Sequence, residues 1–109
     1  MAELTLLEVF GPNTQEDADF IYISKAEMAN VGLTVNESTT GEAYFAAIVA
    51  IAQLRLNQEN QDTNLDQSIV IEDGFPSLIS RNGNTYRQIN KNIIFEKIDT
   101  QTTFDPDDY

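Results

Sequence analysis

Residues 39–56 read TTGEAYFAAIVAIAQLRL, and this stretch decides the fold because it carries the strongest helical pattern in the chain. Thr39 and Glu42 match a capping box, in which each side chain bonds the backbone amide of the other residue at the start of a helix. We therefore expect a helix from about residue 40 to residue 56. At helical spacing one broad apolar face contains Tyr44, Phe45, Ile48, Val49, Ile51 and Ala52.

The opposite side of this predicted helix is made mostly of small residues. Ala43, Ala46, Ala47 and Ala50 would let another backbone approach closely. A helix that is apolar nearly all round is usually covered on more than one side. Two interpretations therefore stay open: the alanines pack on the sheet of the same chain, or they meet the same helix of a second copy.

Arg55 falls at the centre of the broad apolar face. A charge at such a position must reach water or find a partner, and the nearby end of the helix dipole favours a cation. We expect a structural ion pair or a contact with a backbone carbonyl. The alternative is an arginine that binds a ligand.

Ahead of the helix, two runs rich in apolar and β-branched residues predict strands. Residues 4–10 form the first run, which stops at a Gly-Pro turn, and residues 20–24 form the second. Residues 25–33 predict a short helical turn that ends at Gly32, because glycine readily adopts the left-handed conformation that closes helices.

After the helix, residues 57–67 are polar and predict a loop, and residues 68–72 predict a third strand. Asn82 and Gly83 predict the two-residue turn of a β-hairpin, because both residues tolerate positive φ. Residues 85–98 then predict one long strand or two shorter ones. The expected buried centre of this segment is Ile93, Ile94 and Phe95.

Together these elements predict an α+β fold, with a mostly antiparallel sheet of about four to six strands and the helix packed on it. The length of 109 residues favours one domain, which we place at residues 1–98, followed by an acidic tail at residues 99–109. The longest apolar run is too short to cross a bilayer. The start of the chain lacks the basic region of a secretory signal, so a cytoplasmic location is the default expectation.

The residue types that are missing restrict the chemistry. The chain contains no histidine, cysteine or tryptophan. Histidine is the commonest metal ligand and the usual acid or base near neutral pH, and cysteine is the main thiolate nucleophile and ligand. We therefore expect a protein that is not an enzyme and that needs no cofactor.

The net charge of −12, from 18 acidic and six basic residues, argues against nucleic acid as a partner, because phosphate contacts need clustered lysine and arginine. It argues equally against an anionic membrane surface, and it permits steering toward a basic protein partner. The charge is unevenly distributed. Residues 81–98 form a basic segment that contains Arg81, Arg87, Lys91 and Lys97 against the single acid Glu96.

One segment partly matches a calcium-binding loop. Asp62, Asn64, Asp66 and Asp73 occupy positions 1, 3, 5 and 12, where an EF-hand loop places oxygen ligands. Position 6 is Gln67 where the sharp turn needs glycine, and position 12 is aspartate where a bidentate glutamate is usual. A solvated loop is the favoured interpretation, and a calcium site is the alternative.

The acidic tail contains two aromatic residues, Phe104 and Tyr109, beside Asp105, Asp107 and Asp108. Aromatic side chains in a polar segment are natural anchors for a pocket. Three interpretations stay open: a mobile, solubilising end, docking on the basic segment of its own chain or of a neighbour, and a site for a hard cation.

These observations predict a non-catalytic assembly or interaction protein that forms a homo-oligomer, with a dimer favoured, or that serves as an accessory subunit of a larger particle. The candidate interaction residues are Ala43, Ala46 and Ala50 of the helix, Phe104 and Tyr109 of the tail, and Arg87 and Lys91 of the basic segment. One alternative is a module that binds a small molecule or a divalent cation such as calcium. Another is a hydrolase that uses two carboxylates.

Overall fold

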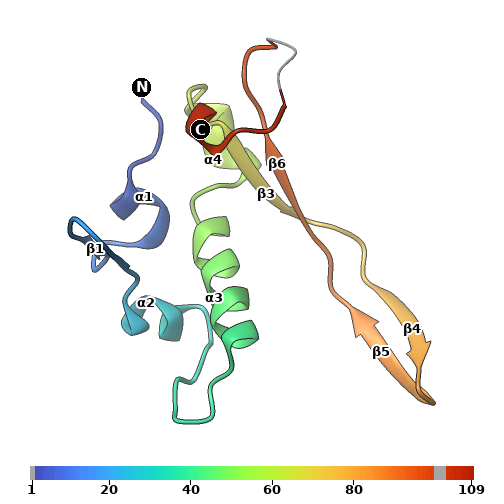
Figure 1. Cartoon of the computed structure of the whole chain (residues 1–109). Coiled ribbons are helices and arrows are strands. Elements are labelled where there is room, and N and C mark those ends of the chain that lie inside the picture. The colour runs from blue at the N-terminus through green and yellow to red at the C-terminus, as the bar shows by residue number, and fades with distance from the viewer. Residues whose placement is uncertain (1, 100–102) are drawn as a thin grey trace.

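Helix α3 (Gly41–Gln53) lies at the centre of the computed structural model, which describes residues 2–99 and 103–109 (Figure 1). The α+β class, the antiparallel strands and the single principal helix are confirmed. In chain order the other elements are α1 (Leu6–Phe10), β1 (Gln15–Glu16), β2 (Ile21–Tyr22), α2 (Lys25–Asn30), α4 (Gln58–Thr63), β3 (Ile69–Asp73), β4 (Ser77–Arg81), β5 (Asn84–Gln88), β6 (Lys91–Phe95) and the 3-10 turn η1 (Pro106–Asp108).

The start of α3 differs from the predicted capping box by one residue. The Ala43 N–H donates to the Thr40 hydroxyl (3.0 Å), so Thr40 is the N-cap. The Thr39 hydroxyl instead accepts from the Asn36 N–H (2.8 Å) in the preceding turn. Either threonine can cap a helix, but the Thr39 hydroxyl is already bonded in the preceding turn, so Thr40 caps α3.

Two short helices replace a predicted strand and a predicted loop. Residues 4–10 contain α1, which begins with a capping box between Thr5 and Glu8. Residues 57–67 contain α4, where Asn57 accepts from the Asn60 N–H (2.8 Å). Both predictions were wrong because an N-cap supplies hydrogen-bond acceptors to the first turn of a helix, which here prevails over the apolar or polar composition.

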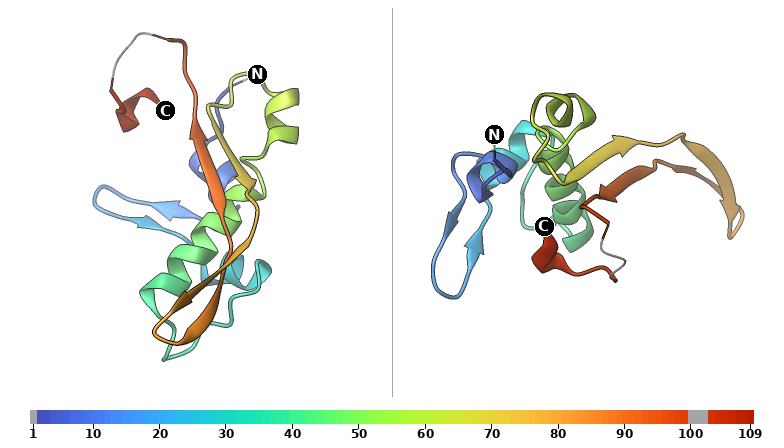
Figure 2. Two further views of the ribbon diagram at one scale, coloured as in Figure 1. Left: turned by 90° about the vertical axis from the view of Figure 1, so that its right-hand side faces the viewer. Right: turned by 90° about the horizontal axis from the view of Figure 1, so that it is seen from above.

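In the part of the chain that the structure describes, six strands form three two-stranded antiparallel sheets instead of one sheet: β1–β2, β3–β6 and β4–β5. The last two pairs are successive halves of one long twisted hairpin, which projects from the body of the molecule (Figures 1 and 2). Between the halves, residues 74–76 face residues 89–90, a bulge of the kind that bends a strand pair. The Asn90 side chain closes this bulge by donating to the Phe75 carbonyl (2.7 Å).

The turn of this hairpin follows the prediction. Asn82 and Gly83 connect β4 to β5 with φ values of 51° and 79°, as a type I′ turn requires at both central positions. We call residues 74–90, which comprise β4, this turn and β5, the distal arm.

The core lies on two sides of α3. On one side Met28, Ala47 and Ile51 are buried against Phe10 and Ile23, and on the other Ala52, Leu56 and Ile71 are buried against residues that include Leu4, Val9 and Val49. The N-terminal helices and β3 therefore cover two sides of the helix from within the same chain. Of the four alanines only Ala47 is buried, and its cluster contains Met28 of α2, so the choice between the two interpretations of the alanines stays open.

Two groups of residues that were expected in the core are exposed. Phe45 is 67% exposed, and Ile93, Ile94 and Phe95 are 42%, 36% and 42% exposed. Strand β6 has only β3 as its sheet neighbour, so a run of apolar residues here does not indicate a buried strand.

Gly11 ends α1 in a conformation that only glycine adopts readily, with φ 105° and ψ 160°. A Cβ atom at this position would lie 2.3 Å from Cδ of Glu27. Glu27 is only 6% exposed, and Asn13 donates to its carboxylate (3.2 Å), so the side chain has little room to move.

We predict that Gly11→Ala lowers the free energy of unfolding by more than the strain alone, which is about 1–3 kcal/mol. Gly32→Ala is the matched control, because Gly32 also has positive φ (99°) but no atom within 4 Å of the added Cβ. Urea unfolding monitored by circular dichroism measures both losses. Equal losses for the two variants would contradict a role for the Glu27 contact.

Candidate functional site

An ion pair joins the two strands of the hairpin where β3 ends and β6 begins, and a hydrogen bond from α3 ties it to the body. Asp73 and Lys91 face each other across β3 and β6, and Lys91 Nζ donates to Asp73 Oδ1 (2.5 Å). Gln53, the last residue of α3, donates to the same oxygen (3.1 Å). The Lys91 hydrogen bond, helped by Gln53, lowers the pKa of Asp73 below its ordinary value. The candidate interaction residue Lys91 therefore has a structural partner in its own chain.

The distal arm has no hydrophobic core of its own. Phe75, Leu78 and Ile89 are 93%, 61% and 73% exposed. Residues directly opposite in an antiparallel pair share a face, so Leu78 lies beside Arg87 on one face, and Ile79 lies beside Tyr86 on the other. The arm therefore presents apolar side chains on both faces.

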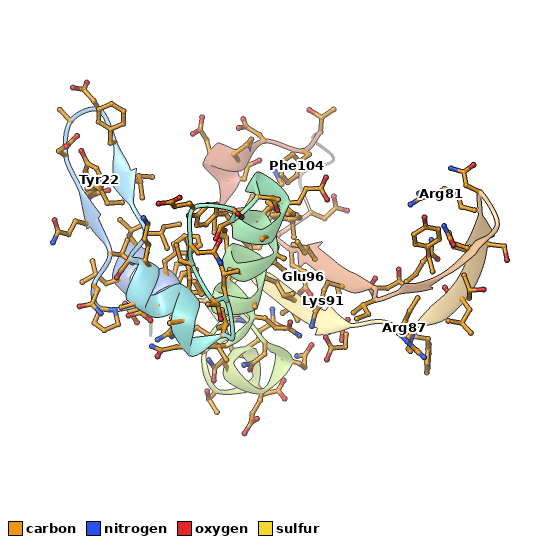
Figure 3. The ribbon with its side chains drawn as sticks, turned by 90° about the horizontal axis from the view of Figure 1, so that it is seen from below. Tyr22, Arg81, Arg87, Lys91, Glu96 and Phe104 are labelled. Carbon is orange, nitrogen blue, oxygen red and sulfur yellow. The ribbon has the colours of Figure 1, made fainter. Side chains whose placement is uncertain are left out.

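Both basic residues of the distal arm lie far from the body. Arg81 packs over the Tyr86 ring, with its guanidinium carbon 4.4 Å from the ring centroid. Figure 3 shows Arg81 and Arg87 toward the outer end of the hairpin, away from Lys91 and Glu96 at its base. Neither arginine forms an ion pair with a residue in the described ranges 2–99 and 103–109. The candidate residue Arg87 is thus available to a partner.

A groove of about 940 Å³ opens where α2, α3, α4 and β3 meet. Its apolar lining includes Val31, Ala50, Leu54 and Ile71. Three acidic residues, Glu59, Glu72 and Asp73, also line it, and we call this surface the acidic groove. Leu54 is 57% exposed. Within the described chain, Glu59 and Glu72 have no side-chain hydrogen bond or ion pair.

The candidate interaction alanines of α3 contribute only partly to this groove. Ala50 lines it, whereas Ala43 is half-buried and Ala46 is exposed. Sequence reasoning missed the groove because its walls come from four elements. The available signal was a helix with apolar residues on every side.

The end of the chain docks on its own hairpin. Phe104 and Tyr109 stand edge-on to Phe95, with ring centroids 4.9 Å and 5.4 Å away, and Lys97 forms an ion pair with Asp108. These contacts match one of the three interpretations of the tail, docking on the basic segment of its own chain, through Lys97 and not through Arg81 or Arg87. Residues 100–102 of the tail lie outside the described residues.

Three of the four candidate calcium ligands use their side chains in other contacts. Asp62 accepts a hydrogen bond from Gln58 within α4 (3.0 Å). The Asn64 side chain donates to the Ala2 carbonyl (2.8 Å) and accepts from the Asp66 N–H (3.1 Å). Asp73 forms the ion pair with Lys91. In the described part of the chain no three acidic side chains are grouped so that they could hold a metal ion.

Arg55 lacks the partner that its position predicted. It is half-buried, and its Nη1 atom is buried without a hydrogen-bond partner in the described residues. The expected ion pair or carbonyl contact is therefore wrong for the isolated chain.

Comparisons with protein-family models, with curated proteins and with solved structures gave no match for this chain. Among residues 2–99 and 103–109, no helix combines the length and the hydrophobicity that crossing a membrane requires.

We predict that the Asp73 ion pair stabilises the fold only above the ordinary pKa of aspartate, about 3.9. Because the folded-state pKa is lowered, this contribution is present above that pH and is lost as the pH falls through the lower folded value. Asp73→Asn should therefore unfold more easily than the wild type at neutral pH, and the difference should vanish in acid.

The measurement is the urea midpoint of both proteins as a function of pH. Glu72→Gln is the control, because Glu72 is the neighbouring carboxylate and has no partner among the described residues. A difference between wild type and Asp73→Asn that stays constant into acid would contradict the role given to the ion pair.

Proposed function

We propose that this protein is a non-catalytic assembly protein that forms a homo-oligomer through its projecting hairpin. The observation that carries the proposal is the amount of surface that the single chain leaves uncovered. The chain exposes 8196 Å², whereas a compact monomer of its mass exposes about 6,100 Å². The excess is about 2,100 Å².

The shape of the molecule agrees with this excess. The radius of gyration is 16.3 Å, against about 13 Å for a compact chain of this length. A stable interface of standard size buries about 800 Å² on each partner. The excess surface is therefore enough for more than one such contact per chain.

The exposed apolar residues indicate where the contacts lie. Phe75, Leu78 and Ile89 on the distal arm are all more than half exposed, and contiguous exposed apolar surface marks interaction sites. A two-stranded hairpin without further cover is marginally stable in water. Burial against a partner supplies the cover that the chain itself does not provide.

The test is the solution mass of the full chain, measured by light scattering over a wide range of concentrations. The chain mass is 12.2 kDa, and we expect at least twice that value. Phe75→Ser with Leu78→Ser should reduce the mass to that of a monomer, because both side chains are exposed in the monomer and buried only on assembly.

Phe20→Ser is the matched control. Phe20 is 63% exposed and lies just before β2. Figure 3 shows Tyr22 of β2 on the opposite side of the molecule from Arg81 and Arg87, so replacement of Phe20 should leave the oligomer intact. A wild-type chain that stays monomeric at every concentration would refute self-assembly and would leave a heterologous partner as the occupant of the arm.

A further inference from the structure

We propose that the distal arm of one copy binds in the acidic groove of a second copy. This inference rests on the proposed self-assembly and names the two surfaces that meet. The first observation is the separation of charge. Residues 74–90 contain Arg81 and Arg87 and no acidic residue, so the distal arm carries +2. The other 92 residues hold all 18 acidic and only four basic residues, for −14.

This separation restricts which surfaces can pair. Two arms repel each other through their arginines, and two bodies repel each other through their acidic residues. Complementary potentials set both the orientation and the partner of an interface, and unpaired like charges are costly. An arm on a body is therefore the pairing that electrostatics favours.

The acidic groove offers the chemistry that the arm needs. Its apolar residues, Leu54 among them, can cover Leu78 or Ile79 of the arm. Glu59 and Glu72 line the groove and have no ion-pair partner among the described residues. They can pair with Arg81 and Arg87, because arginine binds carboxylates through two parallel hydrogen bonds. The groove is shallow and open to solvent, so a projecting arm can reach its lining.

The groove cannot receive the arm of its own chain. Strand β3 forms one wall of the groove and also leads into the arm. The Ile71 N–H donates to the Leu56 carbonyl (2.7 Å), which fixes the start of the hairpin beside the end of α3. From there the hairpin runs away from the body (Figures 1 and 2). The occupant must therefore come from another copy.

A second acidic surface, the β1–β2 hairpin, is a poorer acceptor. It exposes Phe20 and Tyr22 near Glu16 and Asp19. Its central carboxylate, Asp17, already accepts from two backbone amides and from the Tyr22 hydroxyl. This hairpin also projects from the body (Figure 2), so it offers the arm no concave surface.

The experiment uses two variants of the full chain that each lose one half of the contact. The arm variant is Arg81→Glu with Arg87→Glu, and the groove variant is Glu59→Lys with Glu72→Lys. All four residues are exposed, so both variants should fold. We expect each variant alone to have the mass of a monomer, because arm and groove then carry charge of the same sign.

An equal mixture of the two variants should associate again. The arm variant keeps a native groove and the groove variant keeps a native arm, so one native contact can form between them. The expected product has a mass of at least about 24 kDa, twice the chain mass of 12.2 kDa, because the charge-reversed arm and the charge-reversed groove in the mixture also attract each other. The chain with all four substitutions should also self-associate, because its arm and groove are again opposite in charge.

The charge-matched control is Glu16→Lys with Asp19→Lys on the β1–β2 hairpin. It changes the net charge as much as the groove variant does, and it should leave the wild-type mass unchanged. Added salt should weaken wild-type association, since it screens exposed charges.

Three results would overturn the arm-in-groove contact while leaving self-assembly intact. They are a groove variant with the wild-type mass, a mixture that remains monomeric beside a wild-type oligomer, and dissociation by the β1–β2 control alone. A monomeric wild type would instead refute the proposed function itself. Circular dichroism of each variant separates loss of association from loss of fold.

Discussion

The structure depends on the need of α3 to be covered on two sides. Ile51 and Ala52 are neighbours in sequence, and they belong to two different core clusters. The segments before the helix fill one side, and β3 with the chain start fills the other. Once both sides of α3 are covered, a chain of 109 residues has few elements left to pack against the hairpin. Strands β4, β5 and most of β6 therefore extend into solvent. The exposed hairpin follows from how the short chain uses its apolar residues.

Local signals explain which parts of the fold could be predicted from sequence. The main helix and the Asn82–Gly83 turn depend on residues close together in the chain, and both are present. The errors at residues 4–10 and 57–67 have the same origin, because each segment contains an N-cap that was outweighed by composition. The exposure of Ile93 and Phe95 depends on what packs against β6, and no local pattern carries that information.

The candidate site was predictable in its parts and not in its arrangement. The basic segment and the aromatic tail are visible in the sequence, and the structure brings them together at Lys97 and Asp108. It also divides the basic segment: Lys91 and Lys97 bind carboxylates of their own chain, whereas Arg81 and Arg87 bind none in the described residues. The acidic groove is built from four elements that are distant in sequence, so only the fold reveals it.

The positive charges of the distal arm also oppose edge-to-edge pairing between the arms of different copies. A two-stranded ribbon has unpaired backbone groups along both outer edges, and such edges invite pairing between copies. Arg81 and Arg87 oppose that pairing because they place like charges on every arm. The same two residues are attracted by the carboxylates of the groove. The positive charge of the arm therefore acts against arm-to-arm aggregation and, in the proposed assembly, favours the arm-to-body contact, so the same two arginines would serve both purposes.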